Sequence, residues 1–428
     1  MTHDASCRGR SPPARPLGGT ASEGPSTRLR VFAAVCCVLS ICGPERADHG
    51  AWAAETSERQ RLILAHYMPW FEAKPTSVVW GWHWTMNAFD PDEVVDGRRR
   101  IAAKLYPAIG PYDSGDPHVI EYHLLLMKLA GIDGVIVDWY GRRDLWDYAR
   151  IHANASRLVE MAGRLRMKVA ICYEDKTVAQ LVKQRRIAAE ERVTEAVAEV
   201  RWLSAHWFAQ PQYARLADRP LLLSFGREGL DDAEWQRCLD EARVPVAFFS
   251  EHDRRPAAVG GFDWPVPNGG LAEVDRFLAR SREWPARIPV AYPRFLDIYA
   301  EARVHPSFGT VADDDGATFR RSLERGLESG APIVQIATWN DWGEGTAVEP
   351  SLEFGIRDLE VVQSLRRRHL DPAFAGHVDH LAFPGRLLAL RRAAADDARR
   401  ARLDRVSERI VAGDVARAAE ELATLERP

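Results

Sequence analysis

Short apolar runs rich in β-branched residues recur along the chain, and segments with helical spacing separate them. We expect eight of these runs to be β-strands: residues 62–67, 134–139, 168–173, 220–225, 244–249, 259–264, 288–292 and 333–339. The sixth run is the weakest, because Gly260 and Gly261 interrupt it. Alternating strands and helices are typical of βαβ units with a parallel sheet. Eight such units predict an α/β fold, a closed (β/α)₈ TIM barrel.

The segments between the strands contain the expected helices. Residues 118–130 have apolar positions at helical spacing and end at Gly131, a suitable C-cap, while residues 185–208 are predicted to form one longer helix. Residues 70–112 form a long connection after the first strand. Such connections lie at the C-terminal end of a barrel, where function resides, so we expect this segment to wall a pocket.

We predict three parts: a leader and signal peptide at residues 1–53, a catalytic barrel at 54–384, and a C-terminal helical extension at 385–428. The extension is rich in Leu, Ala, Arg and Glu with helical periodicity, which predicts two or three helices with a turn near Gly413. An amphipathic pair could dock on the barrel or contact a partner protein. A solvated helical appendage is the simpler interpretation.

The amino-terminal segment has the order of a signal peptide. The apolar run Val31 to Cys42 directly follows Arg28 and Arg30, and residues 51–53 supply a small-x-small cleavage site. The run is shorter than the roughly 20 residues of a membrane span, so we expect export to the periplasm or medium and no stable span. A later translation start and a lipid anchor at Cys42 are the alternatives.

Bulk composition excludes several classes of function. The 428 residues carry a formal net charge of only −4, and Lys and Arg are spread along the chain, so no nucleic-acid partner is expected. Four of the six cysteines lie within the first 45 residues, which leaves Cys172 and Cys238 and no disulfide framework. No Cys and His pair has zinc-ligand spacing, so we expect no metal and no cofactor.

Tryptophan is abundant, with 14 residues, and several stand beside His, Tyr or Pro in polar contexts. Aromatic faces can stack on the C–H side of a sugar ring while polar neighbours orient its hydroxyls. The alternative for any single Trp is that it fills the core. The composition thus favours an uncharged ligand such as a glycan.

Two acidic residues directly follow the last predicted strand. Asp341 and Glu344 emerge at its C-terminal end, where barrel enzymes keep their chemistry, and Trp339 and Trp342 beside them could raise a carboxyl pKa by desolvation. Glycoside hydrolysis requires such a pair, one group protonating the leaving oxygen and the other assisting attack at the anomeric carbon. The structural alternative is a turn formed by Asn340 and Asp341 with Glu344 capping it.

These residues and three further segments resemble glycoside hydrolase family 99 and its family 71/99-like relatives. Residues 339–346, followed by Glu-Pro at 349–350, resemble the signature Trp-Asn-Glu-Trp-x-Glu-Gly-Thr; residues 66–71 with His83-Trp84, residues 106–114 and residues 131–141 resemble three other family motifs in the same order. The resemblance spans residues 62–350. It implies a metal-independent, retaining, endo-acting α-mannosidase or α-mannanase barrel.

The resemblance also assigns roles. Glu344 corresponds to the general acid/base, and Asp341 to the carboxylate that assists attack by the sugar's own 2-hydroxyl. Asp341 stands where the family has Glu, which withdraws the carboxylate by about one methylene, and a misplacement near 1 Å can cost roughly 100-fold in rate. Residues 174–176, Glu-Asp-Lys, replace a family Glu-Pro-Tyr. The substrate could therefore differ from α-mannan, with α-glucan as the other candidate.

Residues at the ends of other predicted strands, and aromatic residues near them, complete the expected site. Tyr67 could donate a hydrogen bond to a catalytic carboxylate and Glu174 could accept one from sugar hydroxyls, although either could be structural. The predicted substrate-binding residues are His66, Tyr67, Trp70, His83, Trp84, Asp138, Trp139, Tyr140, Glu174, Arg294, Asn340 and Trp342. Residues 313–316, Asp-Asp-Asp-Gly, resemble a calcium loop but lack the wider EF-hand spacing, so we expect a solvated acidic turn.

The leading hypothesis is therefore an exported glycoside hydrolase that acts on an α-linked oligo- or polysaccharide. A non-catalytic carbohydrate-binding protein on a decayed barrel is the alternative, motivated by the Asp at position 341. A scaffold protein that uses its C-terminal helices is the third.

Overall fold

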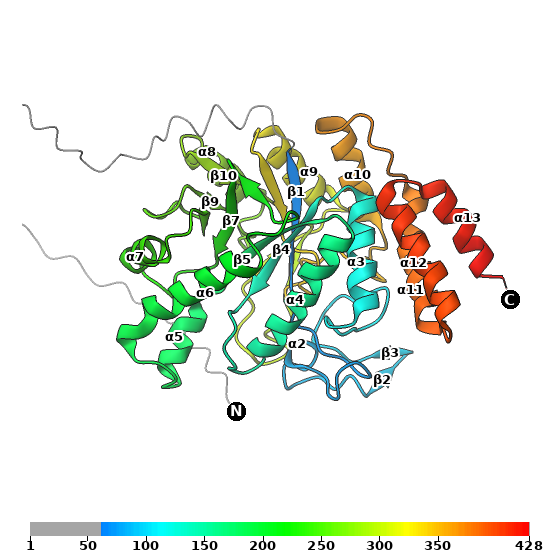
Figure 1. The fold of residues 1–428 in the computed structure, drawn as a ribbon, viewed down its shortest axis with the longest axis horizontal. Coiled ribbons are helices and arrows are strands. Elements are labelled where there is room, and N and C mark those ends of the chain that lie inside the picture. Colours follow the sequence, from blue (N-terminus) through cyan, green and yellow to red (C-terminus); the bar gives the residue numbers. More distant parts are fainter. Residues whose placement is uncertain (1–60, 428) are drawn as a thin grey trace, which may run out of the picture. The chain divides into compact units, whose positions relative to one another are not determined.

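The computed structural model describes residues 61–427 (Figure 1). The predicted leader and signal peptide, and the four cysteines in it, lie outside these residues. Within residues 61–427, no helix has both the length and the apolar character needed to cross a membrane.

Nine parallel strands form the barrel in the order β10-β9-β8-β7-β5-β4-β1-β14-β11. Their bounds are β1 Leu62–Tyr67, β4 Gly134–Trp139, β5 Lys168–Tyr173, β7 Arg219–Ser224, β8 Ala247–Glu251, β9 Gly260–Phe262, β10 Ala286–Ile288, β11 Val290–Ala291 and β14 Ile333–Ile336. Only Pro289 separates β10 from β11, so the two ends of the sheet belong to one interrupted strand. The predicted (β/α)₈ barrel is confirmed.

Close packing of two backbones explains why glycine interrupts the sixth predicted strand. A Cβ atom on Gly260 would lie 1.9 Å from the carbonyl oxygen of Ala286 on the neighbouring strand β10. Only glycine allows this close approach of two backbones. The same residues that interrupt the apolar run therefore permit the pairing of β9 with β10.

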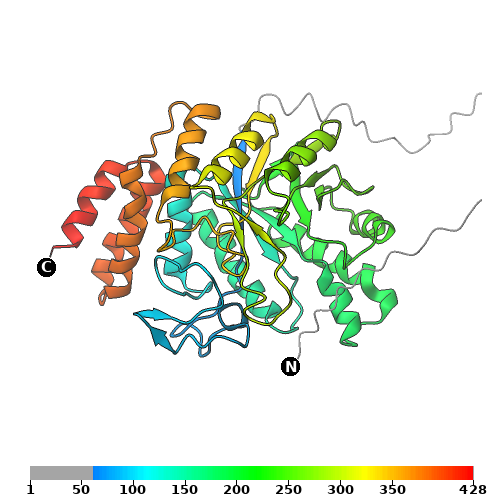
Figure 2. The ribbon, with the colours of Figure 1, turned by 180° about the vertical axis from the view of Figure 1, so that it is seen from behind.

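Helices connect the strands and surround the barrel (Figures 1 and 2). Their bounds are α2 Trp82–Thr85, α3 Pro117–Ala130, α4 Tyr148–Arg164, α5 Lys176–Lys183, α6 Arg192–His206, α7 Asp232–Ala242, α8 Leu271–Arg280, α9 Ala317–Glu328 and α10 Arg357–His369. The single helix predicted over 185–208 is wrong at its start. Arg185 has a left-handed φ of 55°, a 3-10 turn follows at Ala189–Glu191, and α6 begins only at Arg192.

Residues along each strand alternate between two cores. Leu64 and Ile136 belong to a cluster inside the barrel, whereas Ile63, Val135 and Val137 pack in the cluster between the strands and the helices. This alternation follows from the two-residue period of a β-strand. It decides which side chain at the end of each strand faces the mouth of the barrel.

Three helices follow the barrel: α11 Phe383–Ala393, α12 Asp397–Ala412 and α13 Val415–Leu425. Helices α11 and α12 contact α3. In both views the three C-terminal helices lie together at one side of the barrel (Figures 1 and 2). Arg391 of α11 donates to both carboxylate oxygens of Glu121 on α3, at 2.9 and 2.8 Å. The predicted helices are confirmed, with the turn at Gly413, and they dock on the barrel instead of standing in solvent.

Candidate active site

A cavity of about 210 Å³ opens at the C-terminal ends of the barrel strands. Four carboxyl groups line it together with one lysine, two methionines, one glycine and a set of aromatic residues. The lining residues are Met68, Trp70, Phe71, Trp82, His83, Met86, Asp138, Tyr140, Glu174, Lys176, Phe225, Trp264, Tyr299, Asp341, Gly343 and Glu344. The long first connection supplies Trp70 to Met86, as predicted, and so forms one wall.

The turn after β14 brings both predicted catalytic residues to the cavity. The backbone N–H of Asp341 donates to Oγ1 of Thr338 at 2.7 Å. Asp341 Oδ1 in turn accepts the backbone N–H of Glu344 at 3.0 Å. Asp341 therefore shapes the turn that presents Glu344, and it also lines the cavity. The catalytic role of Asp341 stays a prediction.

The two carboxyl groups have different proton affinities. Burial raises the pKa of Asp341 to about 6, opposed by hydrogen bonds from the backbone and by the nearby His83. Burial raises the pKa of Glu344 well above its usual range, and Asp341 and Asp297 add to the effect. Glu344 Oε2 is buried without a hydrogen-bond partner among the described residues. Two carboxyl groups with separated pKa values can divide the roles of acid and base.

A second set of polar residues lines the cavity near the ends of β4 and β5. It consists of Asp138, Glu174 and Lys176. Lys176 Nζ lies 2.9 Å from Glu174 Oε2 and 5.3 Å from the ring centroid of Tyr140. Burial alone would lower the pKa of Lys176, but Glu174 and Asp138 outweigh it, so the pKa rises and the ammonium stays charged. Burial, together with Glu174, raises the pKa of Asp138 well above its usual range.

Aromatic rings make up much of the remaining lining. Trp70 and His83 stack with their centroids 4.3 Å apart and their planes 9° apart. His83 Nε2 also lies 3.4 Å from a carboxylate oxygen of Asp147. Phe225 and Trp264 meet edge to face at 4.9 Å. The cavity thus combines ring faces with polar groups, as sugar binding requires.

The predicted residues Tyr67 and Trp139 lie on the outer side of the barrel. Each is the last residue of its strand, next to a neighbour that points inward, so strand alternation turns it away from the cavity. Trp139 packs near Trp202 and donates to His152 Nδ1 at 3.2 Å. His66 points inward but lies below the cavity, where Nε2 contacts Gln335 at 3.1 Å and burial lowers its pKa to about 3.

Tyr67, Asn340 and Trp342 belong instead to a buried network behind the β14 turn. Tyr67 Oη contacts His123 Nδ1 at 2.9 Å, so its hydroxyl does not reach a catalytic carboxylate as predicted. Asn340 Nδ2 and Trp342 Nε1 donate to the hydroxyl of Tyr112, at 3.1 and 3.2 Å. The carboxylate of Glu349 links the Tyr67–His123 pair to Tyr112. One of its oxygens lies 3.0 Å from His123 Nε2, and the other accepts the Tyr112 hydroxyl at 2.7 Å. Trp84, also away from the cavity, donates to Tyr112 O at 2.8 Å.

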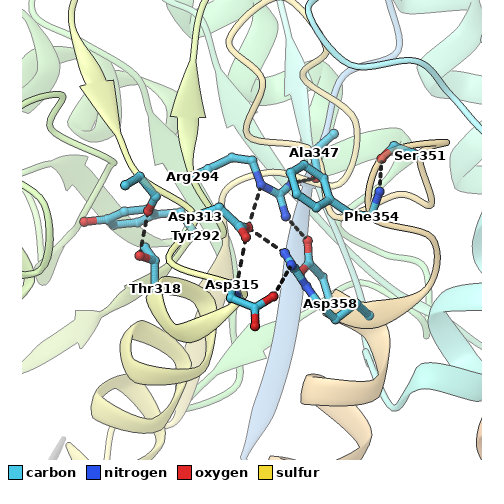
Figure 3. Close-up of polar contacts among 12 residues, drawn as sticks. Tyr292, Arg294, Asp313, Asp315, Thr318, Ala347, Ser351, Phe354 and Asp358 are labelled. Carbon is cyan, nitrogen blue, oxygen red and sulfur yellow. Dashed lines mark hydrogen bonds and ion pairs between the residues drawn. The ribbon is translucent and has the colours of Figure 1, made fainter.

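Arg294 lies in a cluster of ion pairs outside the cavity (Figure 3). Its guanidinium donates to Asp313 at 3.0 Å, to the carbonyl oxygen of Ala347 at 3.0 Å, and to Asp358. Arg357 contacts Asp313 at 2.6 Å. We call Arg294, Asp313, Arg357 and Asp358 the Arg294 cluster. Asp313 also accepts the Gly316 N–H at 3.0 Å, so the acidic segment forms a turn tied to this cluster.

The sequence did not single out several lining residues: Trp82, Phe225, Trp264, Tyr299 and, as a site residue, Lys176. Phe225 and Trp264 are the last residues of two predicted strands. That position was the only feature of the sequence that could have indicated a place in the cavity lining. Tyr299 lies in a loop between β12 Phe295–Leu296 and β13 Thr310–Val311, two short strands that the sequence pattern did not indicate.

Among residues 61–427, a group of possible metal ligands lies on α9 and α10. Glu324 and Glu328 of α9 and His369 of α10 place ligand atoms within 4.8 Å of one another. All three are at least partly exposed, and Glu324 also pairs with Arg368 at 3.0 Å. They do not line the cavity. The independence from metal that the family resemblance implies stays a prediction.

No protein-family model matches this chain. A glycoprotein endo-alpha-1,2-mannosidase-like protein from Danio rerio is 45% identical over 40 residues, a match that spans 9% of this chain and 9% of that protein.

Among solved structures, the family 99 endo-alpha-mannosidase from Bacteroides thetaiotaomicron has a TM-score of 0.57 at 18% identity, over 72% of this chain and 97% of that chain. A glycoside hydrolase-like protein has a TM-score of 0.50 at 11% identity, over 73% of this chain and 94% of that chain. These comparisons confirm that the chain resembles glycoside hydrolase family 99 and has the barrel fold of that endo-alpha-mannosidase.

Proposed function

We propose that this chain is an exported glycoside hydrolase that cleaves α-linked glycans of the α-mannan or α-glucan type. The observation that carries the proposal is the environment of Glu344. Its carboxyl group lines the cavity, its Oε2 is buried without a partner among the described residues, and its pKa is raised. A carboxyl group that keeps its proton near neutral pH and has a free oxygen can protonate a glycosidic oxygen.

Glu344 gives its proton to the departing glycosidic oxygen as the bond from that oxygen to the anomeric carbon breaks. Asp341, ionised above about pH 6, takes a proton from the group that attacks this carbon. With the sugar's own 2-hydroxyl as attacking group, the 2-oxygen forms a bond to the anomeric carbon as the leaving group departs. Water then attacks that carbon and gives a proton to the Glu344 carboxylate, while Asp341 returns its proton to the 2-oxygen, so the product retains its anomeric configuration. Direct attack by water would invert it, so the product anomer distinguishes the two routes.

The other polar and aromatic groups of the cavity suit a neutral sugar. Glu174 and Asp138 offer carboxyl oxygens to hydroxyl groups, and Lys176 offers an ammonium held by Glu174 at 2.9 Å. The stacked pair of Trp70 and His83 offers a flat face at the wall. Polar groups that orient hydroxyls beside aromatic faces are the usual arrangement of a carbohydrate pocket.

The proposal is tested by product analysis of the purified full chain on a panel of α-mannans, α-glucans and host-type glycans, with a chelator present. We expect cleavage of at least one α-linked glycan and internal fragments with retained configuration at the new end. N-terminal sequencing of protein recovered outside the cytoplasm tests export, with Ala54 as the expected first residue. Absence of cleavage across the panel would contradict the proposed activity.

One observation favours a second candidate, a carbohydrate-binding protein without turnover. Asp341 Oδ1 is engaged by the Glu344 N–H at 3.0 Å, which fixes the shorter side chain to its own turn. If that contact prevents Asp341 from assisting attack, the cavity binds glycans and leaves them intact. Binding to the same panel without any product would support this candidate.

A further inference from the structure

The cavity encloses too little space for an oligosaccharide. Its volume of about 210 Å³ is below the roughly 300–1,000 Å³ of typical small-molecule sites. An internally cleaved chain must therefore extend beyond the cavity on both sides of the cleaved bond. Surfaces that bind these outer sugars should adjoin the cavity and should present exposed ring faces.

One row of rings runs outward from the side of Asp138 and Glu174. Tyr140 lines the cavity and stacks on Tyr148 with centroids 4.6 Å apart and planes 25° apart. Tyr148 meets Trp146 edge to face at 5.4 Å. Trp146 is 44% exposed, and its backbone has a left-handed φ of 52°, a conformation that side-chain-bearing residues seldom adopt.

A second row runs outward from the side of Asp341 and Glu344. Tyr299 lines the cavity, and its ring lies 4.4 Å from His305, which lies 4.4 Å from Phe308. Phe308 is 55% exposed. The buried carboxylate of Asp297 holds this loop, accepting the Phe308 N–H at 2.9 Å and the Ser307 hydroxyl at 2.8 Å. These bonds hold the backbone that carries the exposed ring of Phe308.

The two rows start from different parts of the cavity lining. The Tyr140 row follows strand β4 and the Tyr299 row follows β11, and strands β1 and β14 lie between these two in the barrel. Both exposed rings are continuous with the cavity through rings in contact. Isolated apolar residues on a surface are common, but two anchored aromatic rows that converge on one cavity have a shared explanation.

We propose that Trp146 and Phe308 are outer sugar-binding platforms, one on each side of the cavity, and that the ligand is a linear α-linked glycan longer than the cavity. This proposal rests on the proposed glycosidase function and adds to it the two ends of the binding surface. A ring that stacks on a sugar stabilises only those glycans that are long enough to reach it. The platforms therefore determine chain-length preference and leave the chemistry to Glu344 and Asp341.

The test measures binding of α-linked manno-oligosaccharides, from the disaccharide upward, to the full chain carrying Glu344→Gln, by isothermal titration calorimetry. Trp146→Ala and Phe308→Ala are added separately. Each is expected to weaken binding of the longest glycans by roughly three- to tenfold, a size typical of one aromatic contact, and to leave the shortest bound glycan unchanged. Trp146→Phe and Phe308→Tyr keep a ring and should retain most of the affinity.

Leu352→Ala is the matched control, because Leu352 is 49% exposed and belongs to neither row. Equal losses for short and long glycans, an effect of only one platform, or a loss of the same size in the control would overturn the proposal while the cleavage assay still stands. No binding of any glycan, together with no cleavage by the unmodified chain, would overturn both this proposal and the proposed function.

Discussion

Two buried groups of charged residues lie at the same end of this barrel, and they differ in how their charges are paired. In the Arg294 cluster two guanidinium groups face two carboxylates, and Arg294 Nη1 also donates to a carbonyl oxygen. Although burial opposes it, hydrogen bonds from Arg357 and the charge of Arg294 lower the pKa of Asp313. Each charged group of this cluster therefore has an oppositely charged partner.

In the cavity, carboxyl groups outnumber the positively charged groups that could pair with them. Four carboxyl groups share one Lys among the described lining residues. Burial raises the pKa of Asp138, Asp341 and Glu344, and neighbouring carboxyl groups raise the pKa of Asp138 and Glu344 further. Satisfied ion pairs fix a structure, whereas buried carboxyls with too few partners hold protons that can be transferred. We therefore expect the Arg294 cluster to contribute stability and the cavity carboxyls to contribute the chemistry.

The largest effect is expected from Glu344→Gln. The amide has nearly the same shape and can donate no acidic proton, so turnover of glycan should fall by about 10²- to 10⁴-fold, the usual contribution of general acid catalysis. The measurement is kcat/KM on the glycan that the unmodified chain cleaves. The thermal midpoint of unfolding should not fall, and a variant that keeps full activity would remove Glu344 from the reaction.

Arg294→Met should act on stability alone. Removing the guanidinium leaves Asp313 and Asp358 with Arg357 as their remaining cationic partner in the cluster, and breaking a buried ion pair costs about 3–5 kcal/mol. Urea denaturation measures the loss. Arg320→Met, on the exposed face of α9, is the control and should change the free energy of unfolding by less than about 0.5 kcal/mol. A stable variant with weakened activity would place Arg294 in the reaction after all.

Asp341→Asn separates the two roles of this residue. The amide oxygen can still accept the Glu344 N–H, so the turn should persist, but no base remains. We expect kcat to fall by roughly 100-fold, the lower range for proton transfer by a side chain, with little change in glycan affinity. If affinity collapses together with kcat, the turn was lost and the residue is structural.

The smallest effects are shifts of the pH profile. Asp341 must be ionised, so activity should fall as pH drops through about 6, and Glu344 must be protonated, so activity should fall as pH rises through its raised pKa. Lys176 lowers the pKa of Glu344, so Lys176→Met should move only the alkaline limb to higher pH. His83 lowers the pKa of Asp341, so His83→Gln should move only the acid limb upward.

These shifts are read from kcat/KM between about pH 4 and 10, which reports the free enzyme. Lys176→Arg keeps the positive charge and should leave the alkaline limb near its original position. Limbs that stay fixed in both neutralising variants would contradict the assignment of the two carboxyl groups.

The barrel was predictable from the sequence because its signal is local. Each apolar run between polar segments is buried on both faces, as in parallel sheets, and the runs match the strands closely. The start of α6 was not predictable in the same way. Arg185 turns the chain with a left-handed φ, and nothing in its residue type indicates that conformation.

Some residues of the cavity lining were predictable because they stand at the ends of strands, which the local sequence also indicates. Asp341, Glu344 and Glu174 follow apolar strands, Asp138 lies near the end of one, and all four line the cavity. Tyr67, Trp139 and Arg294 also stand at or just beyond strand ends, but the direction of each side chain depends on strand register and on neighbouring loops. Tyr299 and Lys176 reach the cavity through loop geometry and a helix start, which local sequence does not specify.

The central claim is that Glu344 protonates the leaving oxygen, and its most direct test compares leaving groups. The unmodified chain and Glu344→Gln are assayed on the cleaved glycan and on an α-glycoside of the same sugar that carries a dinitrophenolate leaving group, which departs without a proton. The account predicts a large loss on the glycan and a small loss on the dinitrophenyl glycoside. Equal losses on both substrates, or none on the glycan, would contradict it.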